Sequence, residues 1–454
     1  GSKDKLVSLL DDFVARNNLK GYDIWDYDKL RILISRNEPI RRSYAAWITP
    51  GDVLQELIER ISPARPDRRS LIARFLQKEL VTDQFARLEQ AGHSADEAIP
   101  LSQVFVDLPI SKQPRPEHPQ FTYAHGDEEA FVAAMIESSC LKYNGSGPPS
   151  NDHPGSLNNG RFVLIGGPGQ GKTTLGQFAC QIFRAALLVD ADPTTISAEA
   201  ESIIRVIKQQ WEAQEIPKPA ARRLPLRVVL SEFAASLSAK ETNSVIEFLA
   251  AKFRKRTSSQ FTDADMSILL REYPTFLVFD GLDEVPSATN RNEVLAAISD
   301  FWVDVAADDI DTLVVATSRP QGYNDDFSPK QYNHRYLIPL RSEIALLYGQ
   351  KLARVRFGGD DDRYAKVVDR LSKAVGTPAT ARLMRSPLQV TILTLLVDRL
   401  GHPPEERWAL FSEYYKLIYQ RETERDIPTV RVLKEHATDV HAIHRRVGML
   451  LQVE

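Results

Sequence analysis

The chain has 454 residues, of which 43% are apolar and 26% are charged, and its formal net charge is -4 at pH 7. This length exceeds what one hydrophobic core organises, so we expect about three domains of roughly 100–200 residues each. The near-neutral charge balance is typical of a globular protein and argues against a bulk affinity for polyanions, so no nucleic-acid partner is indicated.

Cysteine content and hydropathy indicate the compartment. Only Cys140 and Cys180 are present, and two cysteines cannot cross-link a chain of this size, so we expect a reducing, cytoplasmic setting. The sequence has no run of about 18 apolar residues, and no membrane partner is therefore expected. The chain begins with Gly1-Ser2 instead of Met and stops within a helical pattern, so we interpret it as a fragment of a longer protein.

Residues 1–143 carry the pattern of a helical domain. Apolar side chains recur three and four residues apart, for example over 6–14 and 53–61, which is the spacing of a helix face that packs on a core. A short stretch at 104–108 has the composition of an extended segment. Residues 144–160 consist mainly of Gly, Ser, Pro and Asn, the composition of a linker. We predict an N-terminal helical domain of unknown role, followed by this linker.

Residues 161–340 alternate short apolar runs with longer helical segments. This alternation is typical of βαβ units around a parallel sheet. From residue 341 onward only helical patterning remains. The sequence therefore predicts an α/β core, with a parallel sheet and helices on both of its faces, flanked by all-α N-terminal and C-terminal segments.

A glycine-rich loop follows the first apolar run of this core. Residues 162–165 resemble a buried strand, and the next eight residues match G-x-x-x-x-G-K-[ST] at each fixed position. Backbone N–H groups of such a loop bind phosphates, a lysine such as Lys172 reaches the β- and γ-phosphates, and a hydroxyl such as that of Thr173 binds Mg²⁺. The core is thus a predicted P-loop NTPase that binds ATP or ADP with Mg²⁺. The predicted nucleotide contacts are Gly166, Gly167, Pro168, Gly169, Gln170, Gly171, Lys172, Thr173 and Thr174.

A second buried-strand run, residues 276–279, leads directly into a group of acidic residues. Asp280 comes first after the strand, where it is expected to hold Mg²⁺ together with Thr173. Asp283 and Glu284 follow, and Glu284 is the predicted catalytic base that orients the attacking water. Whether Asp283 or Glu284 dominates stays open at this point.

A third apolar run, residues 313–317, ends in Ser318-Arg319-Pro320. An arginine at the end of a neighbouring strand can contact the γ-phosphate, and Arg319 is therefore a predicted catalytic and sensing residue. The alternative is an ordinary arginine that caps the edge of the sheet.

These blocks together resemble the NACHT clade of STAND signal-transduction NTPases, which includes the NOD-like receptors of animal inflammasomes and bacterial antiphage proteins. The resemblance rests on the P-loop, on the small Gly281 directly after Asp280 with Asp283 and Glu284 beyond it, and on the block 317–320. It covers residues 161–340.

The resemblance extends into the helical part of the chain. Residues 383–388 resemble the helical-subdomain motif whose proline packs on adenine, which implies that Pro387 contacts the base; an ordinary helix start at Ser386-Pro387 would explain the same residues. Arg385 stands where the family usually has a glycine. By this resemblance, residues 341–404 form a helical subdomain and 405–454 the incomplete start of a winged helix.

The resemblance implies a function. Members of this class are switches in innate immunity or phage defence, closed with ADP and open and self-assembled with ATP, so we expect slow ATP hydrolysis, an oligomer on activation and a trigger ligand sensed outside this chain. Two alternatives remain: an AAA-like motor or other P-loop enzyme, and a nucleotide-controlled DNA-binding regulator that uses the winged helix.

Overall fold

The protein is described by a computed structural model, in which the chain divides into two compact units, Gly1–Arg69 and Ser70–Glu454. Apart from a few single positions, the described residues are 2–22, 68–86, 99–114, 128–143, 160–189 and 195–424, with part of 436–447. The helical pattern at 53–61 and nearly all of the predicted linker lie outside them.

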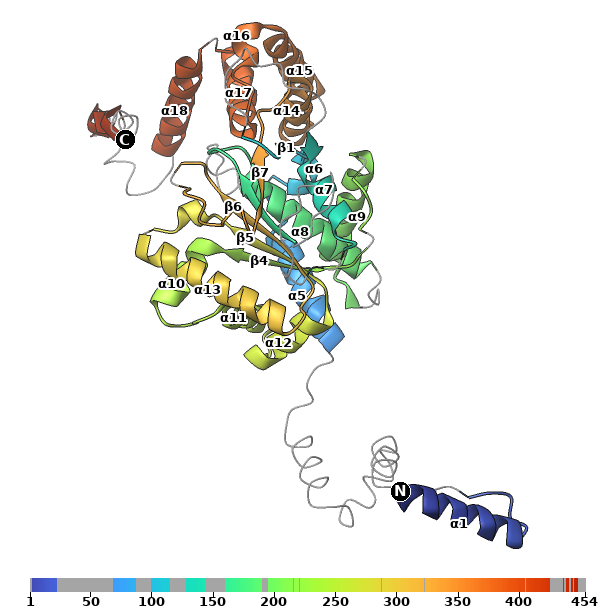
Figure 1. Ribbon diagram of the computed structural model, residues 1–454. Helices are drawn as coiled ribbons and strands as arrows, with labels where there is room; N and C mark the ends of the chain where they lie inside the picture. The colour runs from blue at the N-terminus through green and yellow to red at the C-terminus, as the bar shows by residue number, and fades with distance from the viewer. Residues whose placement is uncertain are drawn as a thin grey trace. The chain divides into compact units, whose positions relative to one another are not determined.

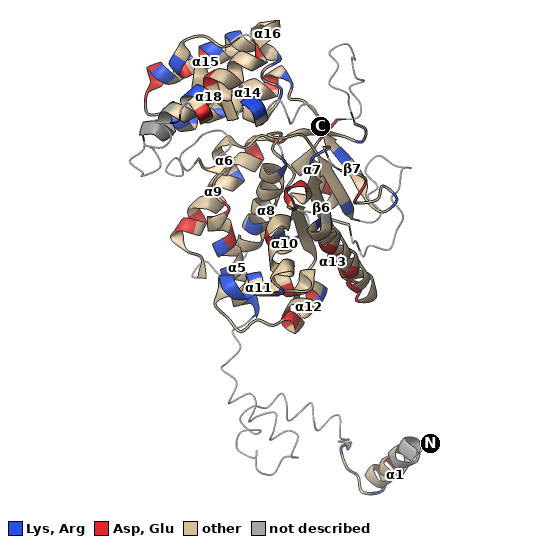
Figure 2. Cartoon of the chain, turned by 90° about the vertical axis from the view of Figure 1, so that its left-hand side faces the viewer, with Lys and Arg blue, Asp and Glu red and all other residues tan. Residues whose placement is uncertain are grey.

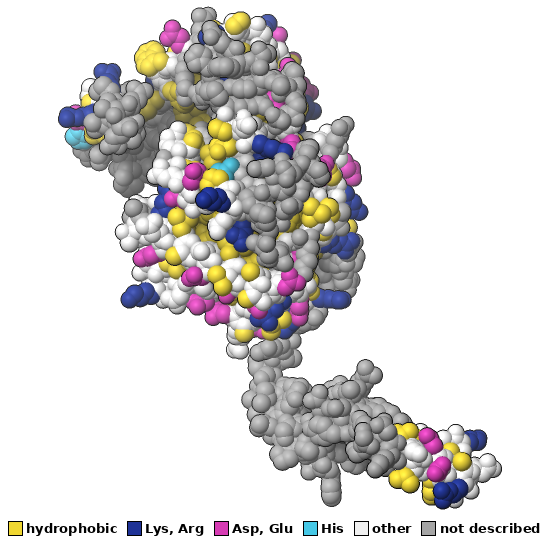
Figure 3. Space-filling model, viewed as in Figure 1, with side chains coloured by type: hydrophobic (Ala, Val, Ile, Leu, Met, Phe, Trp, Pro, Cys, Tyr) yellow, Lys and Arg dark blue, Asp and Glu magenta, His cyan; other side chains and the backbone are white. Residues whose placement is uncertain are grey.

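The described part of the first unit is the helix α1, Ser2–Arg16, and the residues after it. Tyr22 donates a 3.3 Å hydrogen bond from its hydroxyl to the carbonyl oxygen of Val7, so the chain after α1 folds back along the helix. Leu9 and Phe13 are exposed, and α1 shows apolar and charged side chains side by side at its surface (Figure 3).

The second unit is built on a seven-stranded sheet with the order β2-β1-β7-β3-β6-β5-β4 (Figure 1). Strands β3 to β7 are mutually parallel, whereas β1 and β2 are short and add antiparallel at the β7 edge. Every residue of β3, β5 and β6 is buried, which explains their continuous apolar runs. The strands are β1 Pro109–Ser111, β2 Glu129–Ala130, β3 Arg161–Ile165, β4 Leu224–Val229, β5 Thr275–Asp280, β6 Thr312–Ser318 and β7 Asn333–Leu337. The predicted α/β fold is confirmed; the antiparallel extension is an addition that the sequence did not indicate.

Helices cover both faces of the sheet, with α8 and α9 on one face and α13 on the other (Figures 1 and 2). Within β5 the ring of Phe276 lies 5.0 Å from that of Phe183 in α8, and the ring of Phe279 lies 6.4 Å from that of Phe301 in α13. Side chains an odd number of positions apart on a strand point to opposite faces, so β5 contributes to both cores. The helices of this part are α8 Lys172–Leu188, α9 Ala198–Ala213, α10 Leu230–Ser238, α11 Val245–Thr257, α12 Asp263–Glu272 and α13 Ala288–Ala307.

The segment before the predicted linker packs directly on the core. It contains α5 Arg68–Thr82, α6 Leu101–Val104 and α7 Phe131–Ser138. Phe105 stacks on Phe178 of α8 at a centroid distance of 3.6 Å. The boundary between the two compact units falls between residues 69 and 70, so the predicted N-terminal domain over 1–143 includes residues of both units.

The C-terminal part is helical, and its first four helices pack on one another. It joins the core through Leu340, whose amide donates a 2.9 Å hydrogen bond to the carbonyl oxygen of Arg385. Most of the predicted winged-helix start beyond α18 lies outside the described residues. None of the described helices is long and apolar enough to cross a membrane. The helices are α14 Ser342–Phe357, α15 Asp361–Gly376, α16 Pro378–Ala381, α17 Pro387–Leu400 and α18 Arg407–Glu424.

Candidate functional site

The glycine-rich loop turns from β3 into α8, as the sequence predicts. Gly169 and Gly171 adopt left-handed backbone angles, with φ of 69° and 88°, and only glycine takes this conformation without strain. A Cβ at Gly171 would also lie 3.0 Å from a methyl carbon of Leu108. Within the loop, the Gly167 amide donates a 2.6 Å hydrogen bond to the Gln170 side chain. Glycine is therefore required here both for the turn and for close packing.

Lys172 begins α8, and its ammonium lies over the loop, 2.7 Å from the carbonyl oxygen of Gly166. Burial lowers the pKa of Lys172, while the nearby carboxylate of Asp283 raises it and the Arg319 guanidinium lowers it further. The N-terminus of α8 adds the positive end of a helix dipole. Together these features make the loop a receptor for a compact anion such as a phosphate.

Asp280 is buried at the end of β5 and is bound from both sides. Its Oδ1 accepts hydrogen bonds from the hydroxyls of Thr173, at 3.1 Å, and Thr317, at 2.9 Å. Its Oδ2 accepts from the guanidinium of Arg227, at 2.9 Å. Asp280 and Thr173, the two residues predicted to hold a metal, thus lie in contact, whereas the contacts of Thr317 and Arg227 were not predicted.

Arg319 follows β6 and pairs with Asp283. Its Nε lies 2.7 Å from Asp283 Oδ2, and its backbone amide donates a 3.1 Å hydrogen bond to Asp283 Oδ1. Glu284 is exposed and has its carboxylate near Gly281, where an added Cβ would lie 3.2 Å from Glu284 Oε2. The two acids therefore have different surroundings, since Asp283 is held by the arginine and Glu284 faces the cavity.

One cavity of about 280 Å³ collects most of these residues. Of the residues predicted for the site, Gly166, Gly167 and Gln170 shape the loop behind it, and all the others line it, Pro387 included. Part of the cavity wall is mostly apolar. It is formed by Ala86, Val104, Phe105, Val106, Leu108 and Tyr348.

Some of the residues that were missed could have been recognised in part from the sequence. Residues 104–108 stood out as an extended stretch, but nothing placed them against the loop. Arg227 interrupts an otherwise apolar strand, and a buried arginine requires an acidic partner, so an ion pair could have been expected there. Tyr348, whose hydroxyl bonds that of Thr391 at 2.9 Å, gave no signal beyond helical periodicity.

The residues present fit a nucleoside phosphate with Mg²⁺. The loop and the Lys172 ammonium provide positive charge, while the Thr173 hydroxyl and the Asp280 carboxylate, 3.1 Å apart, are hard oxygen donors of the kind that Mg²⁺ prefers. An apolar wall lies where a flat base could pack. The cavity therefore combines groups suited to phosphate and Mg²⁺ with apolar side chains suited to a base.

Comparison with known proteins gives little further information. No protein-family model matches the chain, and no curated protein matches it. Among solved structures, the structure of C. elegans PCH-2 matches with 12% sequence identity and a TM-score of 0.30, over 64% of this chain and 66% of that chain, just under two thirds of its length. Similarity at this level assigns neither family nor activity. The fold assignment rests on the sheet and its helices, which fit a P-loop core.

Proposed function

We propose that this chain binds ATP or ADP with Mg²⁺ in the cavity beside residues 166–173, hydrolyses ATP slowly, and uses the bound nucleotide as a signalling switch of the NACHT type. The ammonium of Lys172 and the N-terminus of α8 support a phosphate at this end. The oxygen donors of Thr173 and Asp280 support the metal. The apolar lining residues, with Pro387, support the binding of a base.

In this proposal hydrolysis depends on the acidic group after β5. Glu284 orients the attacking water and accepts its proton, because its carboxylate is exposed to the cavity and free of the Arg319 pair. Arg319, held by Asp283, stabilises charge on the γ-phosphate. When bound, Mg²⁺ would neutralise charge on the β- and γ-phosphates.

The contact between the phosphate loop and α17 carries the proposal of a switch. The amide of Leu388 donates a 3.1 Å hydrogen bond to the carbonyl oxygen of Gly169, and a Cβ at Gly169 would lie only 2.5 Å from the Cβ of Leu388. A ligand that reshapes the loop must change this contact. ADP and ATP can then favour different positions of the helical subdomain, residues 341–404. A switch requires such a difference between its two states.

As a switch, the chain is closed with ADP and opens and self-assembles with ATP, in the cytoplasm. Its output is signalling in innate immunity or phage defence, and its trigger ligand is sensed by a region outside this sequence. These roles are supported by the resemblance of the three motif blocks to the NACHT clade and by the contact of Gly169 with Leu388.

The test identifies the nucleotide that co-purifies with the chain and then measures the mass in solution by light scattering, with ADP and with a non-hydrolysable ATP analogue. We expect bound ADP, a monomer with ADP and a larger species with the analogue. Lys172→Ala should bind neither nucleotide and keep one mass, because it lacks the ammonium over the loop. A wild-type chain that binds no nucleotide and keeps a constant mass would contradict the proposal.

A further inference from the structure

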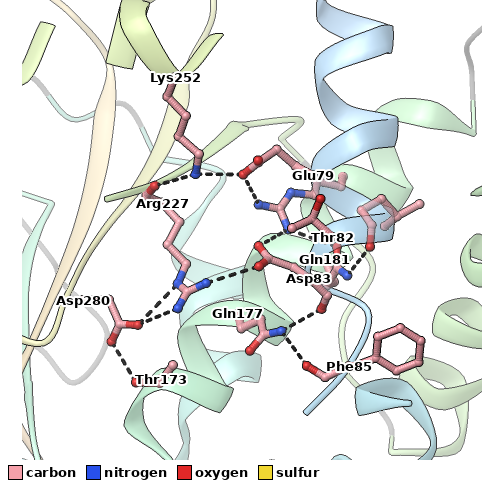
Figure 4. Close-up of polar contacts among 12 residues, drawn as sticks. Glu79, Thr82, Asp83, Phe85, Thr173, Gln177, Gln181, Arg227, Lys252 and Asp280 are labelled. Atoms are coloured by element: carbon pink, nitrogen blue, oxygen red, sulfur yellow. Dashed lines mark hydrogen bonds and ion pairs between the residues drawn. The ribbon is translucent and has the colours of Figure 1, made fainter. Parts of the chain in front are cut away.

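A cluster of buried charges extends from Asp280 away from the cavity and through the core (Figure 4). Its acidic members come from β5, from α5 and from the residue directly after α5, and its basic members come from α8, β4 and α11. The members are Asp280, Asp83, Glu79, Arg227, Arg184, Lys252 and Arg256. Exposure increases only at its outer end, where the side chain of Arg256 is 33% exposed and that of Lys252 is 24% exposed. Charges this deep in a core are tolerated only when each is paired.

Arg227 links Asp280 to the rest of the cluster, which it contacts through Asp83. Its Nη2 and Nε lie 2.9 and 3.3 Å from Asp280 Oδ2, while its Nη1 lies 3.2 Å from Asp83 Oδ1. The guanidinium is planar, so these contacts fix its orientation and, through it, that of the Asp280 carboxylate. Oδ1 of Asp280 remains on the side of Thr173, at 3.1 Å. Arg227 thus holds one carboxylate oxygen and leaves the other turned toward the candidate metal position.

Glu79 in α5 and Asp83, directly after α5, neutralise the inner cations. Arg184, with no exposed surface, lies 2.9 Å from Asp83 and 3.4 Å from Glu79. Burial opposes ionisation of both acids, but the neighbouring cations outweigh it: Lys252 and Arg184 lower the pKa of Glu79, and Arg184 and Arg227 lower that of Asp83. Withdrawal of α5 would leave Arg184 and Arg227 buried with too few acidic partners.

We propose that Arg227 is a positioning residue for the metal-binding carboxylate of Asp280, and that α5 sets this position through Asp83. This inference rests on the proposed function, because it assigns Asp280 to Mg²⁺. Coupling between two sites is reciprocal, so Mg²⁺ and nucleotide also stabilise the docking of α5. The boundary between the compact units, at residues 69 and 70, lies within the first turn of α5. The proposed coupling therefore acts on the helix that begins the second unit.

The experiment measures the dissociation constant of ADP in Mg²⁺ and in EDTA, and takes the ratio of the two as the contribution of the metal. Arg227→Gln should lower this ratio by about tenfold, the size of effect usual for outer residues of metal sites. Asp83→Asn should also lower this ratio, but by a smaller factor. The double variant should be no worse than Arg227→Gln alone, because both substitutions interrupt one chain of contacts.

Arg223→Gln is the matched control. Arg223 is also buried, pairs with Asp311 at 2.9 Å and lies just before β4, yet it touches no member of the cluster. It should lower stability and leave the ratio unchanged. If Arg227→Gln does not fold, Arg227→Lys, which keeps the charge and loses the planar fork, should still lower the ratio.

Hydrogen exchange gives a readout that does not depend on affinity. ADP with Mg²⁺ should slow exchange of the amides of α5 in the wild type, and this protection should be lost in Arg227→Gln. An unchanged affinity ratio in both Arg227 variants, or equal protection of α5 with and without Mg²⁺, would overturn this inference alone. A wild-type chain that binds no ADP would instead overturn the proposed function.

Discussion

Asp283 and Glu284 are adjacent in sequence but differ in what their carboxylates can do. Both oxygens of Asp283 accept hydrogen bonds or ion pairs from Arg319, at 3.1 and 2.7 Å. A carboxylate held in this way has both oxygens occupied and is less available to orient a water molecule. Glu284 has no such partner among the contacts described and lines the cavity. We therefore propose Glu284, and not Asp283, as the base.

This difference predicts separate outcomes for two amide substitutions. Glu284→Gln should bind ATP with nearly unchanged affinity and lose about 10²- to 10⁴-fold in hydrolysis rate, the usual contribution of a general base. Asp283→Asn should release Arg319 and reduce hydrolysis less. Phosphate release in a single turnover measures both rates. Normal turnover in Glu284→Gln together with an inactive Asp283→Asn would assign the base to Asp283.

Two glycines of the phosphate loop test how closely α17 packs against it. Gly169 has φ of 69°, and an added Cβ would lie 2.5 Å from Leu388, whereas a Cβ at Gly167 would find its nearest neighbour at 3.6 Å. We expect Gly169→Ala to lower the free energy of unfolding by about 1–3 kcal/mol through backbone strain and the clash. Gly167→Ala, the control, should change it little. Urea unfolding without nucleotide measures both, and equal stability of the two variants would show that α17 does not press on the loop.

The docking of α5 should make stability depend on pH. The pKa of Glu79 is lowered from 4.5 because Lys252 and Arg184 outweigh its burial. Its folded pKa is below its unfolded pKa, so its contribution is present above about pH 4.5 and is lost as pH falls through the folded pKa. Glu79→Gln should lose roughly 3 kcal/mol at pH 7, the cost of breaking a buried ion pair, and should lose less on acidification than the wild type.

Urea unfolding of each chain at about pH 7, 4.5 and 3 measures the free energy of unfolding above and within the range in which the Glu79 contribution is lost. Glu343→Gln is the control, since Glu343 is exposed on α14, and it should follow the wild type at each pH. An equal loss on acidification in the wild type and in Glu79→Gln would remove Glu79 as a source of the pH dependence.

The elements differed in how well the sequence revealed them. Strands β3, β5 and β6 are buried on both faces, and a continuous apolar run between turn residues predicts such a strand directly. The helix α8 was also predicted, but the burial of three of its polar side chains was not. These are Gln177, Gln181 and Arg184. Gln181 donates to the carbonyl oxygen of Leu80 at 2.9 Å. A polar residue on a helix normally indicates solvent, and its burial depends on a partner distant in sequence, which periodicity cannot identify.

The site follows from the topology of the whole sheet. Parallel strands end at the same edge, and β6 lies between β3 and β5. The phosphate loop therefore meets Asp280 and Arg319 there, although the loop is more than a hundred residues from either of them in sequence. This part of the site could be predicted from motifs alone. The apolar wall at 104–108 could not, because it comes from a segment that the sequence assigned to a separate domain.

Two fragments test which division of the chain is correct. A fragment of residues 68–454 keeps α5, α6 and α7, and we expect it to unfold cooperatively and to bind ADP as the whole chain does. A fragment of residues 161–454, the NTPase core and C-terminal helices as the sequence divides them, lacks Asp83, which pairs with the fully buried Arg184 at 2.9 Å, and the β1 partner of β7.

An uncompensated buried cation and an unpaired strand edge both favour aggregation or a loosely packed state. The shorter fragment should therefore be insoluble or melt without a cooperative transition in calorimetry. If it instead unfolds cooperatively near the temperature of the longer one, then α5 to α7 are not part of the core, and Asp83 cannot be what holds Arg227 against Asp280.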